Sequence, residues 1–197
     1  MAEMAEEGGG RRGSRWRMAL WGTAAFLLLL PLVAMQFTDE VNWSETDFIV
    51  MGAMLLAACG TYELAARAWG NTAYRAAVGV AIASAFFLIW MNLAVGIIGT
   101  ENNPANLMYG GVLAVGIIGA IIARFQPHGM ERALIATALA QALVAVIALV
   151  AGKHQAPISS VFEILGLNGL FVALFIGSAC LFRHAARKQP TNPHLPL

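Results

Sequence analysis

The sequence predicts an all-α protein, a polytopic membrane helix bundle of about six transmembrane helices. Of its 197 residues, 59% are hydrophobic and only 12% are charged, and the mean hydropathy is +0.69. Soluble domains carry about 25% charged residues, so this chain has too little polar surface for a water-soluble fold. Its apolar residues also fall into runs of about 20, the length with which a helix crosses a bilayer.

The amino-terminal segment divides into a polar tail and a first hydrophobic run. Residues 1–15 are polar and glycine-rich and are expected to form a disordered cytoplasmic tail. The run at 18–37 follows four arginines and predicts the first span, kinked at Pro31. A basic flank before an apolar run also suits a cleaved signal peptide, and cleavage stays open. We prefer a retained helix, because the run has the length of a full span and no small-residue cleavage site follows it.

Five further hydrophobic runs predict the remaining spans. We expect these spans at 48–66, 74–99, 106–123, 133–150 and 161–182, within a transmembrane domain covering 16–186 and followed by a disordered cytoplasmic tail at 187–197. Pro127 and Gly129 are read as breaking the helix between the fourth and fifth spans.

Glu63 and Gln141 are polar residues inside these spans. Glu63 and Arg67 stand four residues apart near a membrane edge, where an interfacial ion pair is preferred to a proton-carrying acid. Gln141 lies near the bilayer centre, where its amide needs a partner. A hydrogen bond to a neighbouring helix is preferred there to a ligand contact.

The heptapeptide LAVGIIG occurs twice, at 93–99 and again at 113–119. If the first copy is helical, Asn92, Gly96 and Gly99 share one face. The second copy contributes to a stripe of mostly small residues, Tyr109, Val112, Gly116, Ala120 and Ala123, with Gly119 at its edge. Such stripes are typical of close helix packing in lipid, and a third set in the last span has the same spacing. An alternative is that these glycines loosen helices beside a substrate path.

The middle of the chain, NLAVGIIGTENNPANLMYGGVLAVGIIGAIIARF, resembles the central segment of small multi-pass bacterial inner-membrane proteins of unassigned function. The resemblance implies a membrane location. It brings no catalytic residues to this chain.

The distribution of basic residues predicts the orientation. Eleven of the twelve Lys and Arg residues fall in the two tails and the connections after spans two and four, against Lys153 alone on the other side. Cytoplasmic loops carry the excess of basic residues, so both termini are expected on the cytoplasmic side of a bacterial inner membrane.

Polar residues that could meet a ligand gather on the outer side under this topology. The candidate cluster consists of Asn92, Glu101, Asn106, Tyr109, Asn168 and Glu163. It could collect a cation or hydrogen-bond a small polar solute, although ordinary loop and helix-packing roles are preferred. A weak outer metal site of His154 with Glu101 or Glu163 stays an alternative.

Motifs of catalysis and cofactor binding were not found. The sequence has no H-E-x-x-H, no G-x-S-x-G and no phosphate-binding glycine loop, and its four histidines fall on both sides of the membrane. We expect no catalytic residues, no cofactor, no metal site and no nucleic-acid partner. Cys59 and Cys180 lie at different depths and are not expected to form a disulfide.

The expected function is therefore non-enzymatic: an accessory or interaction role in the inner membrane, with the bilayer and either a membrane protein or a second copy as partners. The alternative is a small transporter or channel.

Overall fold

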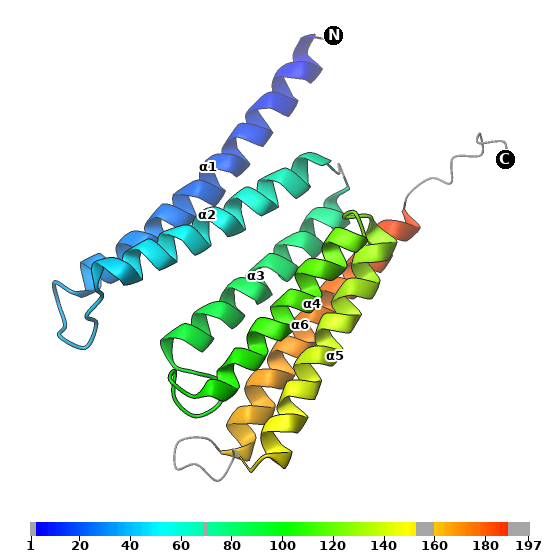
Figure 1. Cartoon of the computed structure of the whole chain (residues 1–197). Coiled ribbons are helices and arrows are strands. Elements are labelled where there is room, and N and C mark those ends of the chain that lie inside the picture. The colour runs from blue at the N-terminus through cyan, green and yellow to red at the C-terminus, as the bar shows by residue number, and fades with distance from the viewer. Residues whose placement is uncertain (1–2, 69–70, 153–159, 189–197) are drawn as a thin grey trace. The chain divides into compact units, whose positions relative to one another are not determined.

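The computed structural model describes residues 3–68, 71–152 and 160–188, and this part of the chain is helical without strands. The helices are α1 (Glu3–Ala34), α2 (Glu45–Ala68), α3 (Thr72–Ala94), the short 3-10 helix η1 (Pro104–Leu107), α4 (Met108–Ile122), α5 (Pro127–Val150) and α6 (Val161–Arg187), as Figure 1 shows. The predicted all-α class is confirmed. Helix α1 includes most of the segment expected as a disordered tail, and most of the carboxyl-terminal tail lies outside the described residues.

Six helical segments are long and apolar enough to cross a membrane. They are Trp16–Ala34, Glu45–Arg67, Thr72–Ala94, Pro104–Ile122, Pro127–Val150 and Val161–Arg187. At 1.5 Å per residue, even the shortest of them, with 19 residues, covers a hydrocarbon core of about 30 Å. Large apolar side chains such as Ile122, Leu139 and Phe162 are exposed on these helices, as lipid-facing positions require. The chain is a multi-pass membrane protein.

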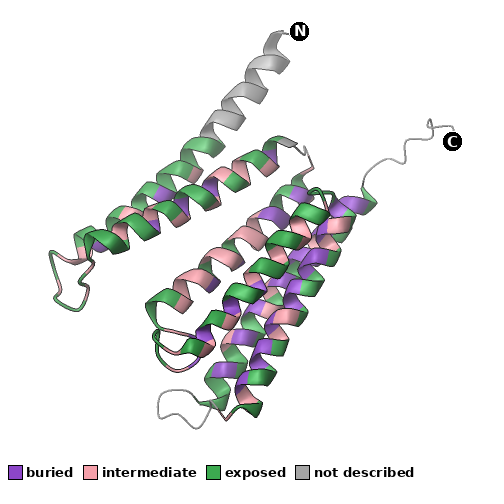
Figure 2. Cartoon of the chain, viewed as in Figure 1, coloured by how far each residue is buried: buried purple, intermediate pink, exposed green. Residues whose placement is uncertain are grey.

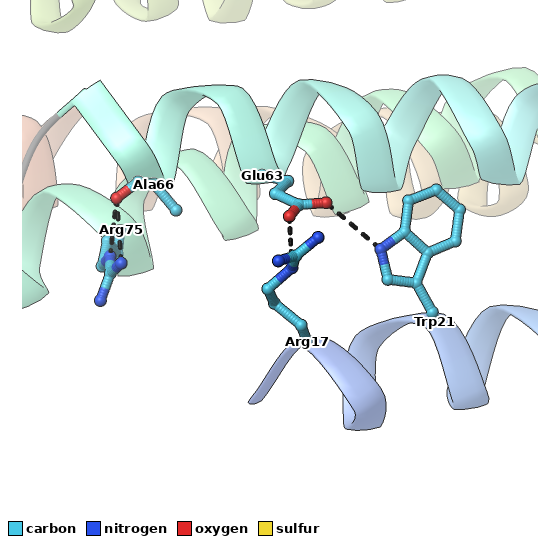
Figure 3. A network of polar contacts seen from close by, with 5 residues as sticks. All are labelled: Arg17, Trp21, Glu63, Ala66 and Arg75. Atoms are coloured by element: carbon cyan, nitrogen blue, oxygen red, sulfur yellow. Dashed lines mark hydrogen bonds and ion pairs between the residues drawn. The ribbon is translucent and has the colours of Figure 1, made fainter. Parts of the chain in front are cut away.

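The chain forms two compact units, residues 1–63 and 64–197. In the first unit, Glu63 near the end of α2 forms an ion pair with Arg17, with 2.5 Å between Arg17 Nε and Glu63 Oε1. Glu63 also accepts a hydrogen bond from Trp21 Nε1 at 3.3 Å (Figure 3). The rings of Trp16 and Tyr62, the residues that precede Arg17 and Glu63 in the chain, have their centroids 6.2 Å apart. The sequence paired Glu63 with Arg67. The structure adds Arg17 of the preceding helix as an ion-pair partner.

The second unit consists of α3 to α6. Helix α6 contacts both α3 and α5, and α5 contacts α4, whereas α3 and α4 share few contacts. Most buried positions in the unit fall on α5 and α6 (Figure 2). Ser178 Oγ of α6 donates to Ala77 O of α3 at 2.7 Å. The helix order around the unit is therefore α3, α6, α5 and α4, and the contact between its two end members is the weakest.

Basic residues gather at one end of the second unit. Tyr74 at the start of α3 donates to Phe125 O between α4 and α5 at 2.8 Å, and Asn71 Nδ2 donates to Ala185 O near the end of α6 at 3.3 Å. Arg75 reaches Ala66 O from Nε and Nη2 (Figure 3). Every described Lys and Arg of this unit lies at this end: Arg67, Arg75, Arg124, Arg132, Arg183, Arg187 and Lys188.

The connection between α4 and α5 is shorter than predicted. Helix α5 begins at Pro127, six residues before the expected start at Ala133. Pro127 stands in the first turn, where a missing N–H costs no hydrogen bond and the fixed φ suits a helix. Gly129 lies against Ala123, so close that a Cβ there would be 2.6 Å from the Ala123 Cβ. The two residues expected to break the helix instead begin it and let the turn close tightly.

Candidate functional site

The turn between α3 and η1 is built by two glycines in the left-handed region. Helix α3 ends at Ala94, and Gly96 and Gly99 follow with φ of 76° and 73°. A Cβ at Gly96 would lie 2.4 Å from the Thr100 carbonyl carbon, so only glycine fits. The third span therefore ends before Gly99, and Asn92, Gly96 and Gly99 do not share a helical face. That prediction is wrong.

Asn106 holds this turn in place. Its side chain is buried, Oδ1 accepts from Ile98 N at 2.9 Å, and Nδ2 donates to Thr100 O at 2.8 Å. Asn103 Oδ1 accepts from Ala105 N at 3.0 Å and caps η1. Local side-chain hydrogen bonds of this kind satisfy backbone N–H and C=O groups that have no hydrogen-bond partner within a helix. Asn106 thus serves the fold of the turn with both atoms of its amide.

Asn92, in the last turn of α3, is only half satisfied. Nδ2 donates to Asn106 O at 3.3 Å, while Oδ1 is buried and has no hydrogen-bond partner in the described part of the chain. The carbonyl oxygen of Asn106 can only accept, so a flipped amide would place two acceptors against each other. The orientation of Asn92 is therefore fixed, and its free atom is an acceptor.

Three buried side chains meet deeper in the unit. Asn168 Oδ1 of α6 accepts from Tyr109 Oη of α4 at 3.1 Å and from Gln141 Nε2 of α5 at 2.9 Å. Asn168 Nδ2 donates to Ile164 O at 2.8 Å, which fixes the orientation of that amide. Gln141 therefore has to present Nε2, and its Oε1 is buried without a hydrogen-bond partner in the described residues. The expected bond from Gln141 to a neighbouring helix is confirmed.

A pocket of about 150 Å³ lies where α3 and α4 separate. Five of its lining side chains are aliphatic, and the polar ones are two amides and one phenol. The lining residues are Leu88, Ile89, Asn92, Leu93, Asn106, Leu107, Tyr109, Gly110 and Leu113. Because Tyr109 lines the pocket and also binds Asn168, the pocket and the buried amides adjoin at this side chain.

The structure brings four of the six predicted cluster residues together. Asn92, Asn106 and Tyr109 line the pocket, and Asn168 binds Tyr109. The two acids serve elsewhere: Glu101 is exposed and accepts from Asn102 Nδ2 at 3.1 Å, and Glu163 forms a capping box with Ser160 at the start of α6. Gln141, which the predicted cluster did not include, belongs with the buried amides. The sequence pointed to it only through its position near the bilayer centre.

No group of three or more potential metal-ligating acids, histidines and cysteines was found among the described residues. His154, the centre of the alternative outer metal site, lies outside them.

The stripes of small residues divide into packed and unpacked ones. On α4, a Cβ at Gly116 would contact Thr137 at 3.2 Å, and one at Gly119 would lie 2.8 Å from the Ala133 Cβ. These two glycines therefore form a close seam with α5. On α6, a Cβ at Gly166, Gly169 or Gly177 would meet nothing within 4 Å. Within the described part of the second unit, the α6 stripe has no packing partner.

Comparison with known proteins adds no family assignment. No protein-family model matches the chain, and no curated protein or solved structure was found to be significantly similar to it.

Proposed function

We propose that this chain is a non-enzymatic accessory protein of a bacterial inner membrane that binds another membrane protein through α6. The observation that carries the proposal is the face of α6 opposite its buried side. Gly166, Gly169, Ala173 and Gly177 follow one another at helical spacing and are all exposed. The buried side carries Asn168, Phe171 and Phe175 instead.

Small residues on an exposed helix face favour a second helix over lipid. Acyl chains are as apolar as leucine, so helices associate in a membrane through close packing, for which Gly and Ala allow the nearest approach. The α4–α5 seam at Gly116 and Gly119 is such a contact within the chain. The α6 face offers the same surface to a partner helix, and Cys180 is exposed one turn further along.

The charge distribution supports the proposed orientation. Arg75, Arg124, Arg183 and the other described basic residues of the second unit share one end, and the positive-inside rule assigns that end to the cytoplasm. The resemblance of residues 92–125 to bacterial inner-membrane proteins supports the same location.

The test is copurification of the tagged full-length protein from its own membranes. Gly169→Leu and Ala173→Leu each place a bulky side chain on the α6 face and should lose a defined membrane protein that the wild type retains. Gly111→Leu is the matched control, because a Cβ at Gly111 also meets nothing within 4 Å and lies on α4. A partner retained in both α6 variants, or lost equally in the control, would contradict the proposal.

The alternative function is a small transporter or channel for a cation or small polar solute. The free acceptor of Asn92 beside a pocket favours it. Solute flux into proteoliposomes should then fall at least tenfold in Asn92→Ala and stay unchanged in Glu163→Gln, whose carboxylate serves the α6 cap.

A further inference from the structure

We propose that an anionic phospholipid binds on the exposed face of the α4 and α5 pair, with its phosphate held by Arg124 and Arg132. Its acyl chains lie along the apolar side chains that follow toward the membrane interior. This lipid face consists of Arg124, Arg132, Ile118, Ile122 and Leu139, all of them exposed. The inference stands independently of the α6 partner, because none of these residues belongs to α6.

The basic end of the second unit has more positive charge than its own acids neutralise. Glu131 is the only acid at this end in the described part of the unit, and it pairs with Arg183 at 3.8 Å. The side chains of Arg124 and Arg132 are exposed and form neither an ion pair nor a hydrogen bond within the described residues. Guanidinium groups bind phosphate oxygens through paired, charge-assisted hydrogen bonds. A phosphate therefore complements these two arginines.

Arg124 and Arg132 lie on either side of one tight contact between the two helices. Gly129 lies against Ala123, so close that a Cβ at Gly129 would be 2.6 Å from the Ala123 Cβ. Arg124 follows Ala123 directly, and Arg132 stands one helical turn after Gly129. Both arginines thus leave the backbone close to this contact, and their long side chains can reach the same phosphate.

The turn that carries Arg124 is held in a fixed conformation. Arg124 and Phe125 have φ of 48° and 57°, a region that residues with a side chain rarely adopt. Phe125 O accepts a hydrogen bond from the Tyr74 hydroxyl at 2.8 Å, and Arg124 N donates to Ile121 O at 3.0 Å. The backbone of Arg124 is therefore positioned before a ligand arrives, which lowers the entropy cost of binding.

Arg132 and the exposed isoleucines of α4 lie on the same side of the helix pair. Gly119 of α4 faces Ala133 of α5, and the two helices run antiparallel (Figure 1). In an antiparallel pair, the residues one position before two facing residues turn to the same side. Here these residues are Ile118 and Arg132. Ile122 follows Ile118 by four residues and shares its face of α4.

The apolar part of the lipid face suits acyl chains. Ile122 and Leu139 are 76% and 66% exposed, and Leu139 stands two turns after Arg132 on the same face of α5. These side chains are large and branched, so they keep a second helix further away than the glycines of α6 do. The arginines lie near the ends of their spans, at the depth of lipid head groups, and the apolar residues lie deeper. The charge and the depth of the lipid face both match an anionic phospholipid.

The test is native mass spectrometry of the full-length protein in detergent with added dioleoyl phosphatidylglycerol. Dioleoyl phosphatidylcholine is the matched control lipid, because it has the same chains and a head group with no net charge. The protein should bind phosphatidylglycerol about tenfold more tightly than phosphatidylcholine. Inorganic phosphate at the same concentration should not displace the bound lipid, because it lacks the acyl chains. Displacement by phosphate would overturn the role of the apolar side chains.

Three double variants separate a built site from general attraction. Arg124→Gln with Arg132→Gln should weaken phosphatidylglycerol binding about tenfold. Arg187→Gln with Lys188→Gln removes two exposed charges from the end of α6 and should leave binding within about twofold of the wild type. Arg124→Lys with Arg132→Lys keeps both charges and should restore most of the binding, which distinguishes a lost site from a misfolded protein.

Equal losses in the first glutamine variant and in the α6 control would overturn the site, because binding would then follow net charge alone. Equal affinity of the wild type for the two lipids would overturn the assignment of an anionic head group. Neither result depends on copurification of a partner through α6.

Discussion

Gln141 and Asn168 meet through one hydrogen bond of 2.9 Å, yet the two amides depend on each other unequally. Asn168 Oδ1 also accepts from Tyr109, and Asn168 Nδ2 donates to Ile164 O, so Asn168 serves several partners at once. Gln141 donates a single hydrogen bond to this arrangement. Its Oε1 is buried and receives no hydrogen bond from the described residues. Removing one amide is therefore not equivalent to removing the other.

Asn168→Leu should destabilise the protein more than Gln141→Leu. Without Asn168, the Tyr109 hydroxyl and Gln141 Nε2 both lose their acceptor, and an orphaned buried group costs about 1–3 kcal/mol. Without Gln141, Asn168 keeps its bond from Tyr109 and an unsatisfied oxygen disappears, so the cost should stay below about 1 kcal/mol. Denaturant unfolding in detergent measures the difference. Equal costs would mean that the hydrogen bonds do not decide stability here.

Substitutions of glycine by alanine should have opposite signs at Gly96 and Gly111. Gly96→Ala puts a side chain at φ 76° and 2.4 Å from a backbone atom, and the left-handed conformation alone costs about 1–2 kcal/mol. Gly111→Ala adds a methyl group in open space on α4, where alanine favours a helix by up to about 1 kcal/mol. Thermal unfolding of the two variants tests the contrast. A Gly96→Ala protein as stable as the wild type would refute the turn geometry.

The two LAVGIIG copies show what local sequence could and could not predict. In the copy at 113–119 every residue is helical, whereas the copy at 93–99 leaves the helix after Ala94. The last five residues of the first copy belong to the turn, and Asn106, eight residues beyond Ile98, accepts a hydrogen bond from the Ile98 N–H. Spans and fold class follow from composition and length, which the apolar runs contain. The helix end follows from a side-chain bond that the heptapeptide does not contain.

The candidate site could be predicted from the sequence only in part. The predicted topology placed Asn92 and Asn106 on the same side of the membrane, and both line the pocket. The meeting of Tyr109, Gln141 and Asn168 depends on α5 lying between α4 and α6, which the sequence did not reveal. The structure places Glu163 in a capping box with Ser160, a role that its position three residues after Ser160 also allows.

Glu63→Gln should change stability by less than about 1 kcal/mol. The Arg17 side chain is 59% exposed, whereas that of Glu63 is 14% exposed, and solvent at the Arg17 side screens the ion pair so that its contribution is small. The amide keeps an oxygen for Trp21 Nε1. Unfolding of the variant in detergent measures the change, with Arg17→Gln as the reciprocal control. A loss of several kcal/mol in both would show that the pair is far less hydrated than its exposure indicates.

Reporter fusions should show that the two ends of the second unit lie on opposite sides of the membrane. Alkaline phosphatase folds only outside the cytoplasm, so a fusion after Asn103, in the turn that Asn106 anchors, should be active. A fusion after Lys188, at the basic end, should be inactive, and a fluorescent reporter that folds in the cytoplasm should give the reverse pattern. This outcome follows from the excess of Arg and Lys at the end formed by Tyr74, Phe125 and Ala185. Activity after Lys188, or inactivity after Asn103, would contradict the proposed orientation and would move the Asn92 pocket to the cytoplasmic leaflet.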